Sequence, residues 1–377
     1  MNIFNIIFPK IKHIHYDEKI NFLKIKNQDE DLLKKNIIKE LKFTKKHTFF
    51  AASARSLILA IIKSLDLREN EFLIFPKYSC SYLYIISDQF SDNIKFCDYN
   101  NDTTYAKSQL LELINTYNIK GVFFSPLFGN DEEYEVISSI REKKIKIIYD
   151  HCQAIKIKKI IEITDYDIYS FNFGKQITGT GGGVLNTNEI IETNHFKSQN
   201  YSYRKKRFLY FLIFSKYRRF FYVFIKLIER TKFLDKFFGQ VFNRERSEIS
   251  SYKIHLIDLY LIKNQVKKVF DDNNKLLKNY VTLNKIFYNN LNYVNHKKSL
   301  CTKYIIQTKN KYVKKRLCNE LRLCGIEYET LFKPHRLNDN IFFEELYLFG
   351  IALPNNNGIN YKKISNKLKK INSILDA

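Results

Sequence analysis

The chain has 377 residues and a formal net charge of +24, because 63 lysines and arginines outnumber 39 aspartates and glutamates. Hydrophobic residues make up 45% of it, which excludes a disordered chain and provides for two lobes with a large core. The charge favours an anionic partner such as a nucleotide, a nucleic acid or an acidic membrane surface without choosing among them, and an AT-rich genome would enrich Lys and Asn in the same way.

The six cysteines are scattered, with no CxxC pair and no histidine at a zinc-binding spacing, so we expect reduced thiols and no metal site. The apolar stretch at the N-terminus is interrupted by Pro9 and Lys10, and it is too short for the apolar core of an export signal. Both features lead us to expect a cytoplasmic protein.

From about Phe49 the chain alternates short apolar strands with helical stretches, a pattern typical of a mostly parallel sheet flanked by helices. The apolar runs predict strands at 72–75, 94–97, 121–125, 145–149, 168–171 and 183–186. Apolar residues at helical spacing predict helices at 56–65, 108–117 and 134–141.

The stretch from 204 to 250 interrupts this alternation with an aromatic and basic sequence that predicts one or two helices. Its longest uncharged run is far shorter than the roughly 20 residues needed to cross a bilayer. An amphipathic helix lying on an anionic membrane through residues 205–230 is one interpretation. The other is a helical excursion that packs on its own protein or on a dimer mate.

After Ser250 the sequence predicts a smaller α+β lobe. A long helix is expected from Ile254 to about Tyr288, and further helices at 312–323 and 361–375. Strands are expected at 304–307 and 326–330.

The segment IIYDHCQA at 147–154 is an apolar strand that ends in Asp150. This places a carboxylate at the carboxyl edge of the sheet, where open α/β sheets bind their ligands. A carboxylate that caps the following turn would have the same sequence.

A second segment, DIYSFNFGKQITGTGGGVLNT at 167–187, runs from a strand through Ser170 to Lys175 and then into a glycine-rich turn. Glycines allow positive φ angles and close backbone approach. Lys175 is therefore a candidate for a phosphate-binding charge or for a Schiff-base nucleophile, which needs a pKa below the ordinary value of about 10.4. An ordinary surface lysine is the alternative.

A third segment, FFAASARSLILAI at 49–61, leads through small residues into a helix that starts near Ser53, Ala54 and Arg55. Backbone N–H groups and the positive end of the helix dipole would bind a phosphate there. Simple N-capping by Ser53 is the alternative.

In this order and spacing, the three segments resemble the DegT/DnrJ/StrS family of sugar aminotransferases, which have fold type I of the pyridoxal-phosphate enzymes. The resemblance covers about 49–203 and reappears from about 250. Its motifs match Asp150 with Gln153, Ser170 with Lys175, the GG turn at 182–183, the phosphate-binding turn at 53–55 and the Leu-Pro pair at 353–354.

The resemblance implies an α/β fold with a mostly parallel, seven-stranded type of sheet and a smaller C-terminal α+β domain. We expect residues 1–45 to form an N-terminal segment that packs on the small domain and residues 46–203 to form the large domain that binds pyridoxal phosphate. Residues 204–250 would be a basic aromatic helical insertion, and 251–377 a helix with the small domain.

The resemblance also implies the roles of single residues. Lys175 would form the Schiff base with pyridoxal phosphate and act as acid and base, and Asp150 would pair with the pyridinium nitrogen. Gln153 would contact the ring, and Ser170 would hold the phosphate with the backbone amides of Ala54 and Arg55, at the turn that Ser53 begins. The acceptor would be a nucleotide-linked keto-sugar, the donor glutamate, the pathway surface glycan or related sugar biosynthesis, and the enzyme a homodimer with a shared site.

Two departures from the family pattern concern the cofactor. Where many members place an aromatic residue that stacks on the ring, this chain has Cys80, and Tyr78 is a candidate substitute. The family's Asn-Tyr-Arg motif, which reaches the partner's cofactor phosphate, aligns with 202–204, where serine replaces asparagine.

Three alternative functions follow. A sugar 3-dehydratase of the same fold would have histidine in place of Lys175, which argues against that activity. A non-catalytic or regulatory relative associated with a membrane is suggested by the two departures and by 205–230. Nucleic-acid binding would fit the charge, but no RNP, helix-turn-helix or zinc-finger pattern accompanies it, so we expect no nucleic-acid partner.

Overall fold

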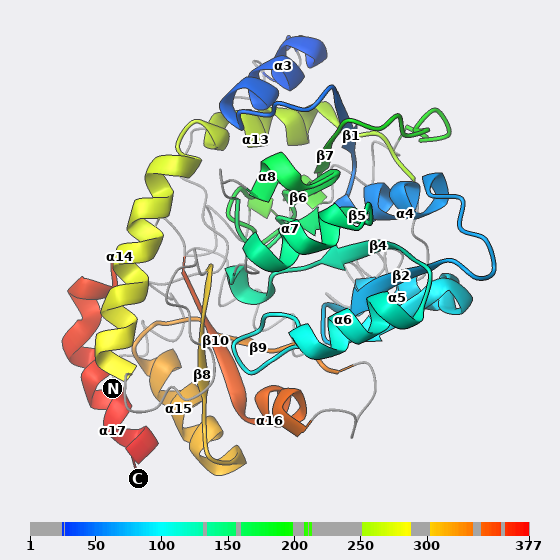
Figure 1. Ribbon diagram of the computed structural model, residues 1–377. Helices are drawn as coiled ribbons and strands as arrows, with labels where there is room; N and C mark the ends of the chain where they lie inside the picture. The colour runs from blue at the N-terminus through cyan, green and yellow to red at the C-terminus, as the bar shows by residue number, and fades with distance from the viewer. Residues whose placement is uncertain are drawn as a thin grey trace, which may run out of the picture.

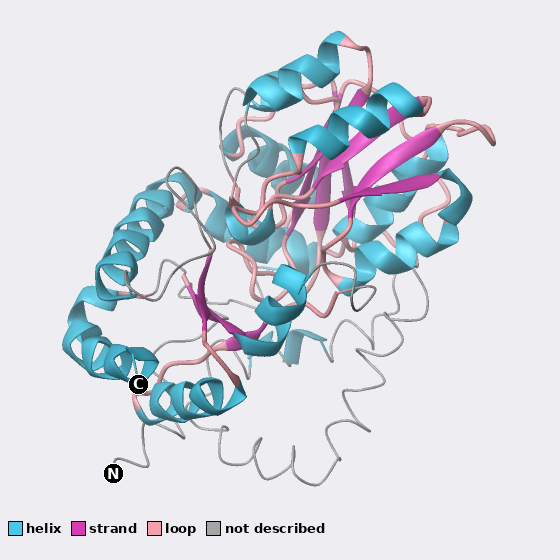
Figure 2. Cartoon of the chain, turned by 60° about the horizontal axis from the view of Figure 1, so that its bottom comes forward, coloured by secondary structure: helices cyan, strands magenta, loops and turns pink. Residues whose placement is uncertain are grey.

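A computed structural model shows a large lobe built on one sheet and a smaller C-terminal lobe (Figures 1 and 2). It describes residues 25, 27–130, 134–155, 160–198, 207–209, 211–212, 251–287, 302–334, 341–355 and 359–376.

The large sheet has seven strands in the order β1-β7-β6-β5-β4-β2-β3. Neighbours from β6 through β3 run parallel, whereas β7 is antiparallel to both β6 and β1. The strands are β1 (His47–Ala51), β2 (Phe72–Pro76), β3 (Ile94–Cys97), β4 (Ile119–Phe124), β5 (Lys146–Asp150), β6 (Tyr166–Ser170) and β7 (Gly183–Thr187). The expected mostly parallel sheet is confirmed.

Successive side chains of the central strands enter two different cores, because side chains alternate between the faces of a strand. On β5, Ile148 packs with α4 (Ala54–Ser64) and α5 (Ser81–Gln89) on one face. Ile147 and Tyr149 pack on the other face with α6 (Lys107–Thr116) and α7 (Tyr134–Glu142). Burial on both faces explains why the three middle residues of β5, 147–149, are all apolar or aromatic.

The smaller lobe contains a three-stranded antiparallel sheet in the order β8-β10-β9. Its strands are β8 (Lys303–Gln307), β9 (Glu329–Thr330) and β10 (Gly350–Pro354), and its helices are α15 (Lys311–Leu323), α16 (Ile341–Phe349) and α17 (Ser365–Asp376). The strand expected over 326–330 is thus only two residues long, and β10 was not anticipated.

The long helix expected from Ile254 is two helices, α13 (Leu256–Val266) and α14 (Val269–Phe287), separated by a turn at 267–268. α13 packs on the large lobe, with Leu259 and Leu261 among the residues of its core. α14, yellow in Figure 1, then runs to the smaller lobe, where Leu283 is buried. The turn lets one chain segment join both lobes.

The described part of the N-terminal segment, residues 25 and 27–45, contacts the large lobe. Its described helix, α3 (Glu30–Glu40), buries Leu33 and Ile37 in the core that α13 and the large lobe share, rather than packing on the small domain. The physical reason is that Leu33 and Ile37, four residues apart, lie on one face of the helix, and the apolar surface beside it belongs to α13.

Most of the basic aromatic stretch, 204–250, lies outside the described residues. At its start, Phe208 and Phe211 are buried in the core of the large lobe, and so is Arg207, which the membrane interpretation placed on an exposed face. These residues therefore pack on their own protein. Among the described helices, none is both long and apolar enough to span a membrane.

Candidate active site

A glycine brings two of the predicted segments together. Gly183, the first residue of β7, pairs with Ala51 on one side and with Ser170 on the other. A Cβ atom at Gly183 would lie 2.3 Å from the backbone nitrogen of Ala54, so only glycine allows this contact. The first turn of α4 therefore lies beside the end of β6.

This contact assembles the donors expected for a phosphate. Ser53 is the N-cap of the 11-residue helix α4, and its Oγ accepts from the Ser56 N–H at 3.3 Å. The first N–H groups of a helix have no acceptor within the helix, and those of Ala54 and Arg55 belong to this turn. The Arg55 guanidinium stacks over the Tyr82 ring at 3.7 Å, so Arg55 would contribute its backbone N–H.

Asp150, the last residue of β5, is 8% exposed. Its Oδ2 accepts a hydrogen bond from Ser125 Oγ at 3.1 Å, and its Oδ1 accepts from the Cys152 backbone N–H at 2.8 Å. The bond from the Cys152 N–H caps the turn that follows β5, as the alternative interpretation of Asp150 predicted. It occupies only part of the carboxylate, which can accept about four hydrogen bonds.

Lys175 lies on the loop between β6 and β7, which is closed by short-range hydrogen bonds. The Lys175 N–H donates to the Asn172 carbonyl at 3.2 Å, and Thr178 Oγ1 donates to the Lys175 carbonyl at 2.7 Å. The preceding residue, Gly174, has φ +73°, a conformation that side chains other than glycine rarely adopt.

Side chains from α13 and α14 hold the same loop in place. Gln265 accepts from the Thr178 N–H at 3.0 Å and donates to the Thr178 carbonyl at 2.8 Å. Gln176 donates to Asn273 on α14 and accepts from the Ile155 N–H at 2.8 Å. Gln176 therefore ties the Lys175 loop directly to the turn that follows Asp150.

Cys152 connects the predicted acid and the predicted lysine. Burial raises the pKa of its thiol well above the ordinary value, the Asp150 charge adds to this shift, and the Lys175 charge opposes it. Cys80 also acts on the pKa of this thiol. Asp150, Lys175 and Cys80, which the sequence assigned to one site, therefore all lie within electrostatic range of Cys152.

Tyr78 has a different environment from its neighbour Cys80. Its ring is 2% exposed and stacks on Phe343 of α16 at 4.3 Å, while its hydroxyl donates to the Phe332 carbonyl at 2.8 Å. Tyr78 thus contacts the smaller lobe. Cys80, the N-cap of α5, is partly exposed and lies on the side of Cys152.

Gln153 follows Cys152 in the turn, where its carbonyl accepts from Thr302 Oγ1 at 2.6 Å. The positions aligned with the family's Asn-Tyr-Arg motif, 202–204, lie outside the described residues.

Sequence reasoning missed Ser125, Cys152, Gln265, Asn273 and Arg207. Arg207 is 2% exposed, and its guanidinium donates to the Thr180 carbonyl at 2.6 Å and to Asn172 Oδ1 at 2.8 Å, at the two ends of the lysine loop. The only sequence signal was its place in a basic stretch, which indicated an exposed charge instead.

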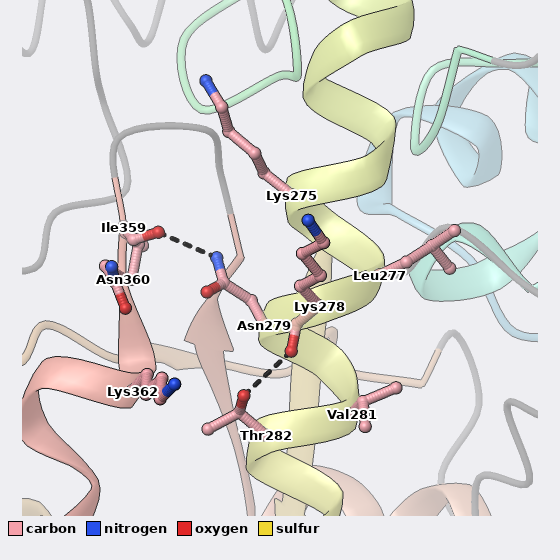
Figure 3. Close-up of a pocket in the computed structure, with 9 residues that line it drawn as sticks. All are labelled: Lys275, Leu277, Lys278, Asn279, Val281, Thr282, Ile359, Asn360 and Lys362. Atoms are coloured by element: carbon pink, nitrogen blue, oxygen red, sulfur yellow. Dashed lines mark hydrogen bonds between the residues drawn. The ribbon is translucent and has the colours of Figure 1, made fainter.

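The described chain also has a cavity of about 730 Å³ away from these residues. It lies between α14 and residues 359–362 and is lined by three lysines, Lys275, Lys278 and Lys362, beside apolar side chains (Figure 3). None of the predicted site residues lines it.

The residues of the site fit pyridoxal phosphate. The backbone contact that Gly183 permits provides a cradle of helix N–H groups and hydroxyls, which suits a phosphate. The buried carboxylate of Asp150 suits a protonated ring nitrogen, and Lys175 would supply the amine that such a cofactor requires.

Comparisons with known proteins agree with this fit. Residues 45–218 match the model of the DegT/DnrJ/EryC1/StrS aminotransferase family. No curated protein sequence matches the chain. Among solved structures, PseC of Helicobacter pylori, an aminotransferase involved in the biosynthesis of pseudoaminic acid, is similar with a TM-score of 0.67 at 16% identity, covering 97% of this chain and 99% of that one.

Two further structures have the same fold. The apo-form of Spr1654 of Streptococcus pneumoniae, described as a sugar aminotransferase, has a TM-score of 0.69 at 15% identity, with 97% and 99% of the chains covered. GDP-4-keto-6-deoxy-D-mannose-3-dehydratase of E coli, solved with hydrated pyridoxal phosphate bound, has a TM-score of 0.65 at 14% identity, with 98% of each chain covered.

The fold, the site and the matched segment define a pyridoxal-phosphate-dependent aminotransferase. The part that matches the DegT/DnrJ/EryC1/StrS aminotransferase family model, residues 45–218, contains every predicted cofactor-binding and catalytic residue.

Proposed function

We propose that this aminotransferase moves an amino group from glutamate to a nucleotide-linked keto-sugar, with Lys175 as the residue that carries the cofactor. The observation that supports the proposal is the environment of the Cys152 thiol, whose pKa is raised by the Asp150 charge and lowered by the Lys175 charge. The names of PseC and Spr1654 support a sugar as the acceptor.

When bound, pyridoxal phosphate supplies an aldehyde and a ring that withdraws electrons from the reacting carbon. The chain supplies the remaining functions. Asp150 would hold a proton on the ring nitrogen, because a buried carboxylate stabilises an adjacent positive charge. Ser53, Ser170 and the N–H groups of Ala54 and Arg55 would bind the phosphate.

Lys175 would move a proton to and from the substrate carbon, a role that requires both mobility and a fixed starting point. The loop meets both requirements: its backbone is held by Thr178, Gln265 and Gln176, while the Lys175 side chain itself is only partly buried. We further propose that Gln153 and Cys80 border the ring.

A nucleoside diphosphate carries negative charge, which the net charge of +24 would attract. We propose a homodimer in which the partner completes the site, as the family resemblance implies. Membrane contact through 205–230 remains a prediction, and the buried Arg207 and Phe208 at its start favour packing on the protein itself.

The test is a spectrum of the purified protein incubated with pyridoxal phosphate, before and after glutamate, followed by borohydride reduction and peptide mass analysis. We expect the absorbance to shift with glutamate and the reduced adduct to lie on Lys175. Lys175→Ala should abolish the adduct, whereas Lys63→Ala, at an exposed lysine on α4, should not. An adduct on any other lysine would refute the assignment.

The dehydratase among the similar structures motivates a second candidate, loss of water from the sugar. Lys175 favours amino transfer, because the related dehydratases have histidine at this position. Mass analysis of products from a set of nucleotide keto-sugars distinguishes the two, since amination replaces the carbonyl oxygen and dehydration removes a hydroxyl. A protein that binds the cofactor but changes none of these sugars would favour the non-catalytic relative.

A further inference from the structure

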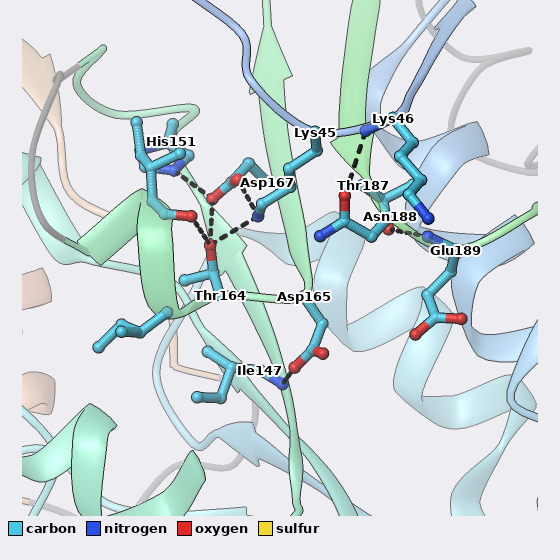
Figure 4. Close-up of polar contacts among 12 residues, drawn as sticks. Lys45, Lys46, Ile147, His151, Thr164, Asp165, Asp167, Thr187, Asn188 and Glu189 are labelled. Atoms are coloured by element: carbon cyan, nitrogen blue, oxygen red, sulfur yellow. Dashed lines mark hydrogen bonds and ion pairs between the residues drawn. The ribbon is translucent and has the colours of Figure 1, made fainter.

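The proposed chemistry does not use a buried ionic cluster that includes His151, the residue next to Asp150 in the chain. Its centre is Asp167 on β6, which is 0% exposed. The Asp167 carboxylate accepts from Lys45 Nζ and from Thr164 Oγ1, the latter at 2.8 Å, and its Oδ1 lies 3.0 Å from His151 Nε2 (Figure 4). His151 is the residue that follows Asp150, and it is 3% exposed.

The cluster determines which nitrogen of His151 carries a proton. Lys45 forms an ion pair with the buried Asp167 carboxylate, and the Thr164 hydroxyl donates to the same carboxylate. An ionised carboxylate can only accept hydrogen bonds, so His151 Nε2 must donate. His151 Nδ1 is buried and has no hydrogen-bond partner among the described residues, so a second proton there would have no acceptor.

Ring contacts fix the plane of the imidazole. It stacks on the Tyr169 ring with centroids 4.7 Å apart and an interplanar angle of 8°, and the Tyr149 ring lies 4.7 Å away at 43°. The His151 backbone N–H also donates to the Ile168 carbonyl at 2.7 Å, which continues the pairing of β5 and β6 past Asp150.

The residues on either side of His151 are hydrogen-bonded to each other. Asp150 precedes it, and Cys152, whose N–H donates to Asp150 Oδ1, follows it. A displacement of the His151 ring would therefore move the turn that orients the Asp150 carboxylate. A misplacement of about 0.5 Å is enough to disturb such a group.

We propose that His151 is a positioning residue for Asp150, held in place by the buried Lys45–Asp167 pair. The proposal rests on the proposed function only in assigning Asp150 to the cofactor's ring nitrogen. The ring of His151 packs against Tyr149 and Tyr169, and its effect is transmitted through the backbone of the turn.

The experiment compares variants by titrating the apoprotein with pyridoxal phosphate and recording the dissociation constant, the absorbance spectrum and the Tm. His151→Phe keeps a stacking ring but removes the donor to Asp167, and we expect about ten-fold weaker binding, a loss of about 1.4 kcal/mol, with an altered spectrum. His151→Gln retains an amide N–H that can reach Asp167, and it should recover most of the affinity and the wild-type spectrum. His195→Phe, at an exposed histidine, is the matched control and should change neither.

Asp150→Asn separates the two proposals. If it alters the spectrum and the affinity while His151→Phe does not, the positioning role of His151 is refuted and the proposed function stands. If Asp150→Asn changes neither, the assignment of Asp150 fails, and the role of His151 fails with it. Equal losses of Tm in the Phe and Gln variants, with unchanged spectra, would show a purely structural residue.

Should His151→Phe fail to fold, His151→Asn replaces it, because its shorter amide does not reach Asp167.

Discussion

Ser125 and Asp150 are joined by a hydrogen bond of 3.1 Å between the hydroxyl of the first and the carboxylate of the second. The two residues stand at the ends of neighbouring parallel strands, β4 and β5, and are 7% and 8% exposed. The residue that follows β4 thus supplies a donor to the acid on which the proposed chemistry depends.

Replacing Ser125 with alanine should leave the Asp150 carboxylate less well oriented, because it removes the hydrogen bond from the Ser125 hydroxyl. A hydrogen bond to a charged group contributes about 1.5–3 kcal/mol, so we expect the variant to lose stability on that scale and to bind pyridoxal phosphate several-fold more weakly. Urea unfolding and cofactor titration measure the two effects. Ser139→Ala removes a hydroxyl bonded to a helix carbonyl on α7 and should leave cofactor binding unchanged; equal effects of the two variants would contradict the prediction.

Replacing Gly183 with alanine should separate α4 from β6. Its Cβ would lie 2.3 Å from the Ala54 nitrogen and 2.6 Å from the Ala54 Cα, so the backbone must move. We expect a loss of stability of about 1–3 kcal/mol, the usual cost of overpacking, and a greater loss of affinity for pyridoxal phosphate than for pyridoxal. Competition between the two vitamers measures this difference, and a proportional loss for both would show that the phosphate is held elsewhere.

The thiol of Cys152 should react slowly with alkylating agents. Burial raises its pKa, as does the Asp150 charge, so little thiolate is present at pH values where an ordinary cysteine with a pKa of about 8.5 reacts. Asp150→Asn should speed the reaction because it removes a negative charge, and Lys175→Ala should slow it. Peptide mass analysis after timed alkylation gives the rates, with bound cofactor expected to protect the thiol; a variant order opposite to this would show that the charges do not act on Cys152.

Alkaline pH should unfold the protein through its buried tyrosines. Burial raises the pKa of Tyr166 to about 12 and also raises those of Tyr169 and Tyr361 well above the ordinary value. In the unfolded chain these groups titrate near pH 10, so between the two values the folded state holds more protons and stability falls as the pH rises. Each such group contributes a slope of up to about 1.4 kcal/mol per pH unit.

Urea midpoints recorded from pH 9 to pH 12 test this dependence. Tyr361→Phe removes one titrating hydroxyl, so its stability should fall less steeply above pH 10 than that of the wild type. An unchanged slope would mean that Tyr361 does not titrate differently in the two states.

Most of the large sheet could be predicted because its strands are short apolar runs with helices between them. β1 and β10 were missed for physical reasons: the sequence HTFFA combines polar and aromatic residues without a strand's alternation, and GIALP begins with glycine and ends with proline. The turn at 267–268 was not visible either, since helical spacing continues through it and only the packing of α13 and α14 on different lobes requires a break.

The sequence could predict candidate site residues that belong to one continuous motif. It could not predict residues that reach the same loop from distant segments of the chain. Asp150 and Lys175 could be named as candidates from their spacing to Gln153 and Ser170. Gln265 and Asn273 reach the lysine loop from 87 and 97 residues away, and their sequence surroundings are those of ordinary helices.

The contacts of Tyr78 have a mechanical consequence. The loop that carries it also carries Cys80, so this loop of the large lobe is joined to the smaller lobe by the hydrogen bond to Phe332 and the stack on Phe343. A hinge motion that swings the smaller lobe outward would have to break both contacts, at about 1 kcal/mol each. A displacement of the smaller lobe is therefore passed to the segment before α5 through one aromatic side chain.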